Sequence, residues 1–102
     1  MSVIKNPIEL YEKTDINKEE INKIICINMK KFRKEKYEEF KNNNQNSENP
    51  YSLDNISFAL GISKVHYKRL ENKNDKNKNI TLIRLIKLAK IYDKTLDDFL
   101  QK

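Results

Sequence analysis

The segment KVHYKRLEN, residues 64–72, concentrates side chains that can bind an anionic partner. At about 100° per residue, one side of a helix over this segment carries Tyr67, Leu70 and Glu71. The opposite side carries mostly basic and small residues, namely Lys64, Val65, Lys68, Arg69 and Asn72. The major groove of DNA admits such a helix, because its walls are phosphates and its floor presents hydrogen-bond acceptors and methyl groups. The alternative interpretation is a charged helix face that contacts only solvent.

Arginine is rare in this lysine-rich chain. Of 21 basic residues, 18 are lysine and three are arginine: Arg33, Arg69 and Arg84. The planar guanidinium can donate two parallel hydrogen bonds to a carboxylate, a phosphate or a guanine edge, which an ammonium group cannot do. Arg69, on the basic side, is therefore the predicted guanine reader. Arg84, near the start of a predicted helix, is predicted to contact a backbone phosphate.

Residues suited to catalysis or metal binding do not form a cluster in the sequence. His66 and Cys26 are the only histidine and the only cysteine, so no metal site built on these ligands is expected. The carboxylate pairs at 38–39 and 97–98 fit exposed helix surfaces and caps. With a single glycine, the chain has no glycine-rich loop for phosphate. We expect no enzyme activity, no cofactor and no metal, and no feature indicates a small-molecule ligand.

Composition restricts the class of protein further. The 102 residues suffice for one domain, and a net charge of +6 with a pI near 9.4 favours an acidic partner, either nucleic acid or an anionic membrane surface. An AT-rich genome, which favours Lys, Asn and Ile, would produce the same charge without a functional cause. No apolar stretch is long enough to span a membrane, no signal-peptide pattern is present, and the lone cysteine fits a reducing compartment. We therefore expect a soluble protein of the cytoplasm.

The elements that must position these residues are predicted from apolar periodicity and caps. Residues 1–16 are interpreted as an N-terminal arm with one short helical turn. Asn17 and Glu20 resemble a capping box, and apolar residues at helical spacing then predict a long helix over about 17–42. The polar run NNNQNSEN contains nothing to bury, so residues 41–50 are predicted to be a flexible insertion loop.

Gly61, the only glycine, divides two short predicted helices. Ser52 is the predicted N-cap of the first helix and Ser63 that of the second. Gly61 closes the first helix, because glycine adopts a positive φ without steric cost. Apolar periodicity after Thr81 predicts a further helix, and the capping sequence TLDD at 95–98 begins a short last one. The expected architecture is all-α, with five helices and no strands.

The run SLDNISFALGISKVHYKRLEN, at 52–72, resembles the helix-turn-helix motif of the phage-repressor type (XRE/Cro-like) family of DNA-binding proteins. MKKFRKEK, at 29–36, is similar to the family's first helix, and TLIRLIKLAKIYDKTLDDFL, at 81–100, to its last two. The resemblance implies a five-helix lambda-repressor-like domain over 17–102. Two features depart from the family pattern: a lengthened first helix, and Leu53 where the family often has a phosphate-contacting glutamine.

The resemblance also implies roles for individual residues. The predicted base contacts are Lys64, Val65, Lys68 and Arg69. Phosphate contacts are assigned to Ser52, His66, Asn72 and Arg84, with packing as the alternative role of His66. Arg33 of the first helix is predicted to form a partly buried ion pair with Glu71, at the end of the recognition helix.

Together these features predict a sequence-specific regulator that binds double-stranded DNA, namely a transcriptional repressor from a phage, a mobile element or a low-GC bacterium. The alternative is a protein-interaction module that uses the same fold with little DNA affinity, such as an antitoxin or a polymerase-binding factor. Because one short recognition helix reads few base pairs, we expect a homodimer on two half-sites. Its contact surface is predicted either near the C-terminus, at Ile83, Leu88, Ile91 and Phe99, or on the arm, at Ile4, Ile8 and Tyr11.

Overall fold

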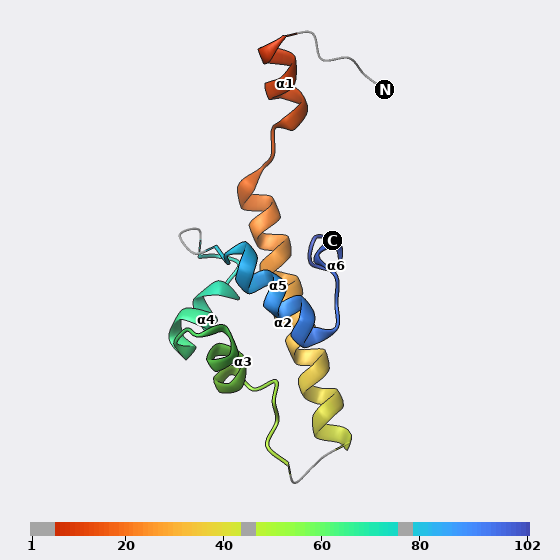
Figure 1. Ribbon diagram of the computed structural model, residues 1–102, viewed down its shortest axis with the longest axis vertical. Helices are drawn as coiled ribbons and strands as arrows, with labels where there is room; N and C mark the ends of the chain where they lie inside the picture. Colours follow the sequence, from red (N-terminus) through yellow and green to blue (C-terminus); the bar gives the residue numbers. More distant parts are fainter. Residues whose placement is uncertain (1–5, 44–46, 76–78) are drawn as a thin grey trace.

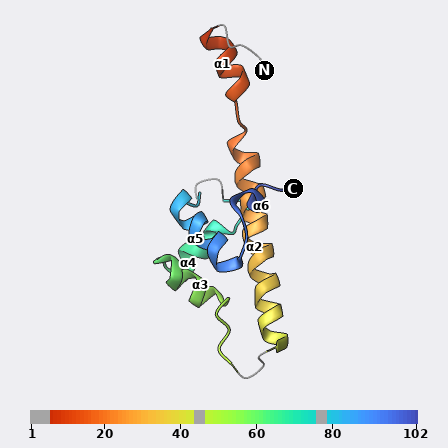
Figure 2. The same ribbon diagram turned by 45° about the vertical axis from the view of Figure 1, so that its right-hand side comes forward.

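A computed structural model describes residues 6–43, 47–75 and 79–102, and over these residues the chain is entirely helical, without a strand. The described ranges contain six helices: α1 (Pro7–Thr14), α2 (Lys18–Asn43), α3 (Leu53–Leu60), α4 (Lys64–Leu70), α5 (Leu82–Tyr92) and α6 (Leu96–Phe99). The all-α prediction is confirmed, and the five predicted helices correspond to α2 through α6. Figures 1 and 2 show α2 as a long rod, with α3, α4 and α5 gathered beside its middle part.

The long helix α2 forms because nothing in its sequence interrupts it. The side chain of Asn17 caps its first turn, accepting a hydrogen bond from the backbone N–H of Glu20 at 3.1 Å. No glycine or proline occurs between residues 18 and 43. One face of α2 is apolar and buries Cys26, Met29 and Phe32. Both α5 and α6 pack against α2, so this helix supports the rest of the domain.

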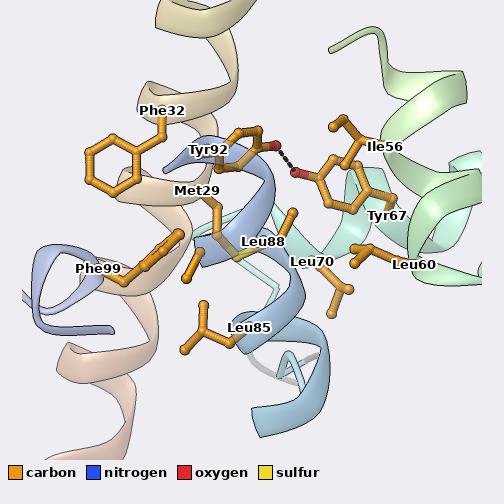
Figure 3. Packing of buried hydrophobic residues seen from close by; sticks show 11 residues of the cluster. Met29, Phe32, Ile56, Leu60, Tyr67, Leu70, Leu85, Leu88, Tyr92 and Phe99 are labelled. Atoms are coloured by element: carbon orange, nitrogen blue, oxygen red, sulfur yellow. Dashed lines mark hydrogen bonds between the residues drawn. The ribbon is translucent and has the colours of Figure 1, made fainter. Parts of the chain in front are cut away.

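The core is a single cluster that joins α2 to all four of the shorter helices that follow it. Its buried members are Met29, Phe32, Ile56, Leu60, Tyr67, Leu70, Leu85, Leu88, Ala89, Tyr92 and Phe99. Figure 3 shows how these side chains meet between α2 and the other helices. The rings of Phe32 and Phe99 pack edge to face with centroids 5.0 Å apart, and the hydroxyl groups of Tyr67 and Tyr92 lie 3.3 Å apart.

The C-terminal end of the chain is tied to α2 by a buried amide. Asn28, only 6% exposed, donates hydrogen bonds from its side chain to the carbonyls of Phe99, at 2.8 Å, and Gln101, at 2.7 Å. The predicted capping box of Thr95 and Asp98 is present and begins α6. Because a buried amide without partners is costly, Asn28 fixes where the short helix α6 sits on α2.

The N-terminal arm contains more structure than the one turn that we expected. α1 is a complete helix of 8 residues, because Asn6 accepts the N–H of Glu9 at 2.8 Å and Pro7 occupies the first helical position, where a missing N–H costs nothing. None of its residues is buried. In Figures 1 and 2, α1 lies beyond the start of α2 and away from the other helices, which accounts for the molecule's extents of 62 × 29 × 20 Å.

The predicted flexible loop at 41–50 needs correction at both of its ends. Residues 41–43 are the last turn of α2, residues 44–46 lie outside the described residues, and Asn49 is held in place. Its side chain donates to the carbonyl of Tyr37 at 2.9 Å and accepts the N–H of Tyr51 at 3.0 Å. The polar run has no apolar group to bury, but hydrogen bonds anchor Asn49 instead.

Two of the residues predicted at a dimer surface lie in the core. Leu88 and Phe99 are both 0% exposed, so neither can contact a second copy. Ile91 is half-buried and packs against the core, while Ile83 is exposed. The physical reason is that other helices cover both side chains: Leu88 belongs to the core cluster, and Phe99 of α6 packs against Phe32 of α2. The apolar periodicity within one helix does not reveal such contacts. On the arm, Ile8 and Tyr11 are exposed and Ile4 lies outside the described residues.

Candidate nucleic-acid interface

The helices α3 and α4 are joined by the turn that the single glycine predicted. Ser52 caps α3, and Gly61 ends it with φ at +71°, its N–H donating to the carbonyl of Phe58 at 3.0 Å. The next N–H, from Ile62, reaches the carbonyl of Ser57 at 3.1 Å. Ser63 then caps α4 by accepting the N–H of His66 at 3.0 Å. Two carbonyls at the end of α3 are thus satisfied within a three-residue turn.

The orientation of α4 follows from its apolar side. Tyr67 and Leu70 are 0% and 2% exposed and anchor the helix in the core. The opposite side faces solvent and carries Lys64, Val65, Lys68 and Arg69. Asn72, two residues beyond the end of α4, is exposed as well. The four predicted base-contacting residues therefore share one open face of the molecule.

Two of these exposed cations have carboxylate partners. Lys64 lies 3.6 Å from Asp54 of α3. Arg69 donates from Nε to Asp75 at 3.1 Å, with about half of its side chain exposed. Asp75 thus orients the guanidinium at the end of α4 while leaving its two terminal nitrogens available, and these two groups can still donate in parallel to a guanine edge.

The expected ion pair between Arg33 and Glu71 is present and fixes α4 against α2. Nε and Nη2 of Arg33 donate to the two carboxylate oxygens at 2.8 and 3.0 Å, and both side chains are nearly buried. Burial lowers the pKa of Arg33, but the hydrogen bonds and charge of Glu71 outweigh this effect and leave the pKa above its usual value. Nearby, the thiol of Cys26 donates to the carbonyl of Leu70 at 3.0 Å, and burial raises the pKa of this thiol. α2 and the end of α4 are therefore joined at two points.

A pocket of about 670 Å³ opens between α2 and the end of α4, and we call it the lysine groove. Cys26, Ile27 and Leu53 contribute its apolar surface. Its charged lining consists of the paired Arg33 and Glu71 together with Lys30, Lys31, Lys34, Lys68 and Lys73. Within the described ranges, none of these five lysines forms an ion pair. The groove is therefore a strongly positive site, and Lys68 makes it continuous with the exposed face of α4.

The lysines that α2 contributes to the groove were missed by sequence reasoning, as was Lys73. The predicted pairing of Arg33 with Glu71 could have indicated the lysines that lie near Arg33 on the same side of the helix. On a helical wheel, Lys30 and Lys34 lie within about 100° of Arg33, so a helix that directs Arg33 toward the end of α4 directs these two lysines to the same side.

The predicted phosphate-contacting residues are distributed over several elements. Asn72 lines the lysine groove, and its side-chain oxygen accepts the N–H of Asn74 at 3.0 Å. Its NH₂ group is the part of the side chain that can donate to a phosphate. Ser52 is half-buried and uses its oxygen as the N-cap of α3. His66 is half-buried on α4, and Arg84 lies half-buried in the first turn of α5, outside the groove. The structure thus brings Asn72 together with the lysines and keeps Arg84 apart from them.

Other classes of site are not found in the part of the chain that the structure describes. There, no three or more His, Cys, Asp and Glu side chains gather where they could hold a metal ion. Nor does any described helix combine the length and the apolar character needed to cross a membrane.

Comparisons of the chain with protein-family models, with curated proteins and with solved structures give no match. The resemblance to the phage-repressor type family thus remains a hypothesis that rests on the motif residues. The exposed face of α4 and the lysine groove beside it are the features of the described structure that bear on function.

Proposed function

We propose that this protein is a sequence-specific, double-stranded DNA-binding transcriptional regulator that acts as a repressor in the cytoplasm. The observation that carries the proposal is the exposed, basic face of α4 next to the lysine groove. α4 is short and anchored by Tyr67 and Leu70, and it follows α3 after a three-residue turn. A helix presented in this way can enter the major groove, and cations beside it can contact the phosphates at the groove's edge.

On this proposal the face of α4 reads bases. Arg69 donates to guanine O6 and N7 with its terminal nitrogens, while Asp75 holds Nε. Val65, 69% exposed, offers methyl groups to the methyl group of thymine. Lys64 and Lys68 contact bases or phosphates, because a flexible ammonium group has no fixed geometry.

The lysine groove fixes the position of the protein on the duplex. Its five lysines can neutralise backbone phosphates without discriminating between base sequences. Ser52, His66, Asn72 and Arg84 are assigned the same kind of contact. Each neutralised phosphate adds about 0.9 to the negative slope of log affinity against log salt concentration, so the contribution of the groove can be measured separately from base reading.

We further propose that the protein binds DNA as a homodimer. α4 spans only 7 residues and can reach few base pairs, so high specificity requires two half-sites related by a two-fold axis. Selection from random duplexes followed by footprinting tests the proposal. A palindromic site protected at physiological salt is expected. Recovery of no preferred sequence, with equal affinity for all duplexes, would contradict it.

A second function, a protein-interaction module, is favoured by one observation. Phe58 is 85% exposed on the outer face of α3, where a large aromatic side chain in water suggests contact with another protein. In that case Lys64 and Arg69 would keep their carboxylate partners, Asp54 and Asp75, rather than turn to DNA. Two results together would favour this second function. The unaltered protein would bind no DNA duplex, and Phe58→Ser would abolish its binding to a partner protein.

A further inference from the structure

The charges of the chain are separated between its arm and its body. Residues 6–16, the described part of the arm, hold three carboxylates and one lysine, for a net charge of −2. Residues 17–102 hold 19 basic and 12 acidic residues, for a net charge of +7. An arm with an excess of carboxylates therefore lies at one end of a basic molecule (Figure 1).

α1 is also amphipathic, and the described part of the chain does not bury its apolar arc. Leu10, Tyr11 and Ile8 occupy one arc of the helical wheel, and Glu12 and Glu9 occupy the adjoining arc. None of the residues of α1 is buried, and Ile8 and Tyr11 are about 70% exposed. An isolated helix of 8 residues is marginal in water, so a surface that covers its apolar arc would stabilise it.

The lysine groove has the chemistry that complements this helix. Its apolar surface, which includes Ile27, 50% exposed, and Leu53, can cover the arc of Ile8 and Tyr11. Its five lysines form no ion pairs within the described ranges and can meet the two glutamates of α1. We propose that α1 of one copy of the protein docks in the lysine groove of a second copy.

Docking within one copy does not satisfy the same geometry. Residues 15–17 join α1 to α2, and a reversal of direction within these three residues would place Glu9 about 8 Å along α2 from its start. Lys31 and Lys34 lie about 20 and 24 Å from that start. A folded-back α1 could meet Lys73, which also lines a pocket with Asn22 and Lys23 near the start of α2, but it would stop short of Lys31 and Lys34. The α1 of a separate copy has no such restriction.

Reciprocal docking closes a two-fold dimer, because each copy offers one arm and one groove. The docking itself does not depend on DNA. Its consequence for regulation does rest on the proposed function: the acidic arm and DNA phosphates would compete for the same lysines, so the arm would weaken binding to non-specific DNA.

A charge-swap experiment on the full chain, without DNA, tests the docking. One variant carries Glu9→Lys and Glu12→Lys, and the other carries Lys30→Glu and Lys34→Glu. Each variant alone brings like charges together in both contacts, whereas a mixture restores opposite charges in both. Sedimentation at low salt should show dimers of the unaltered protein, a dimer dissociation constant at least about tenfold higher for each variant alone, and dimers again in the equimolar mixture.

Several outcomes would overturn the docking. The first is an unaltered protein that stays monomeric at millimolar concentration in low salt. The second is that the variants dimerise as well as the unaltered chain. The third is a mixture that forms no dimers although circular dichroism shows that both variants are folded. Addition of 1 M NaCl should also dissociate the native dimer, since exposed charges are screened over about 3 Å at that salt concentration. A salt-independent dimer would point to an apolar surface instead.

Discussion

The nearly buried pair of Arg33 and Glu71 carries opposite charges in a site with little access to water. Removing the charge of one partner leaves the other desolvated, so Glu71→Gln should lower the free energy of unfolding by about 3 kcal/mol. The exposed pair of Lys64 and Asp54 provides the control, and Asp54→Asn should cost at most about 1 kcal/mol. Urea titrations measure both differences, and an unchanged midpoint for Glu71→Gln would show that the pair does not hold α4 in place.

The paired hydroxyl groups of the buried Tyr67 and Tyr92 predict that the protein loses stability in alkali. Burial raises the pKa of each above the usual value of 10.0. Above pH 10 the unfolded state therefore releases protons that the folded state retains, and the free energy of unfolding should fall by up to about 2.7 kcal/mol per pH unit. Tyr92→Phe should halve this slope between pH 10 and 11.5. Equal slopes in both proteins would mean that Tyr92 ionises freely in the folded state.

Among the elements, the turn between α3 and α4 depends on one backbone conformation. Gly61 has φ at +71°, and an added Cβ would meet no atom within 4 Å, so any cost of Gly61→Ala is backbone strain rather than collision. We expect a loss of about 1–2 kcal/mol. Asp93, at φ 56°, is the matched control, because Asp93→Gly relieves the same kind of strain. Thermal unfolding should show the first variant destabilised and the second unchanged or stabilised. The opposite order would be inconsistent with this explanation.

Helices α2 to α6 could be predicted from the sequence because each begins at a side-chain cap and repeats apolar residues at helical spacing. Local patterns of this kind do not contain the contacts of distant residues. Asn49 looked like part of a mobile polar run, yet it is bonded to Tyr37, 12 residues away. Leu88 looked available for a partner, yet it is fully buried in the core cluster to which α2, α3, α4 and α6 also contribute. The predictions failed where a distant element supplied the partner.

Across the whole molecule, the candidate site was predicted in part. The exposed face of α4 follows from the positions of Tyr67 and Leu70 in the sequence, and so does the pairing of Arg33 with Glu71 by way of the family resemblance. The lysine groove is assembled from α2, α3 and the end of α4, and only the tertiary arrangement brings its lysines together. The difference in charge between arm and body can be counted in the sequence. The proposed docking of the arm in the lysine groove also requires that α1 is a helix that lies apart from the body.

One set of binding titrations can separate the proposed base reading by α4 from the proposed phosphate contacts of the lysine groove. Affinities for the selected duplex and a scrambled duplex are measured at several salt concentrations for the unaltered protein, Arg69→Ala and Lys34→Ala. Arg69→Ala should lose about 1–3 kcal/mol on the selected duplex only. Lys34→Ala should weaken both duplexes alike and reduce the salt slope by about one. If Arg69→Ala weakens both duplexes equally, Arg69 contacts only phosphate, and the assignment of base reading to α4 is contradicted.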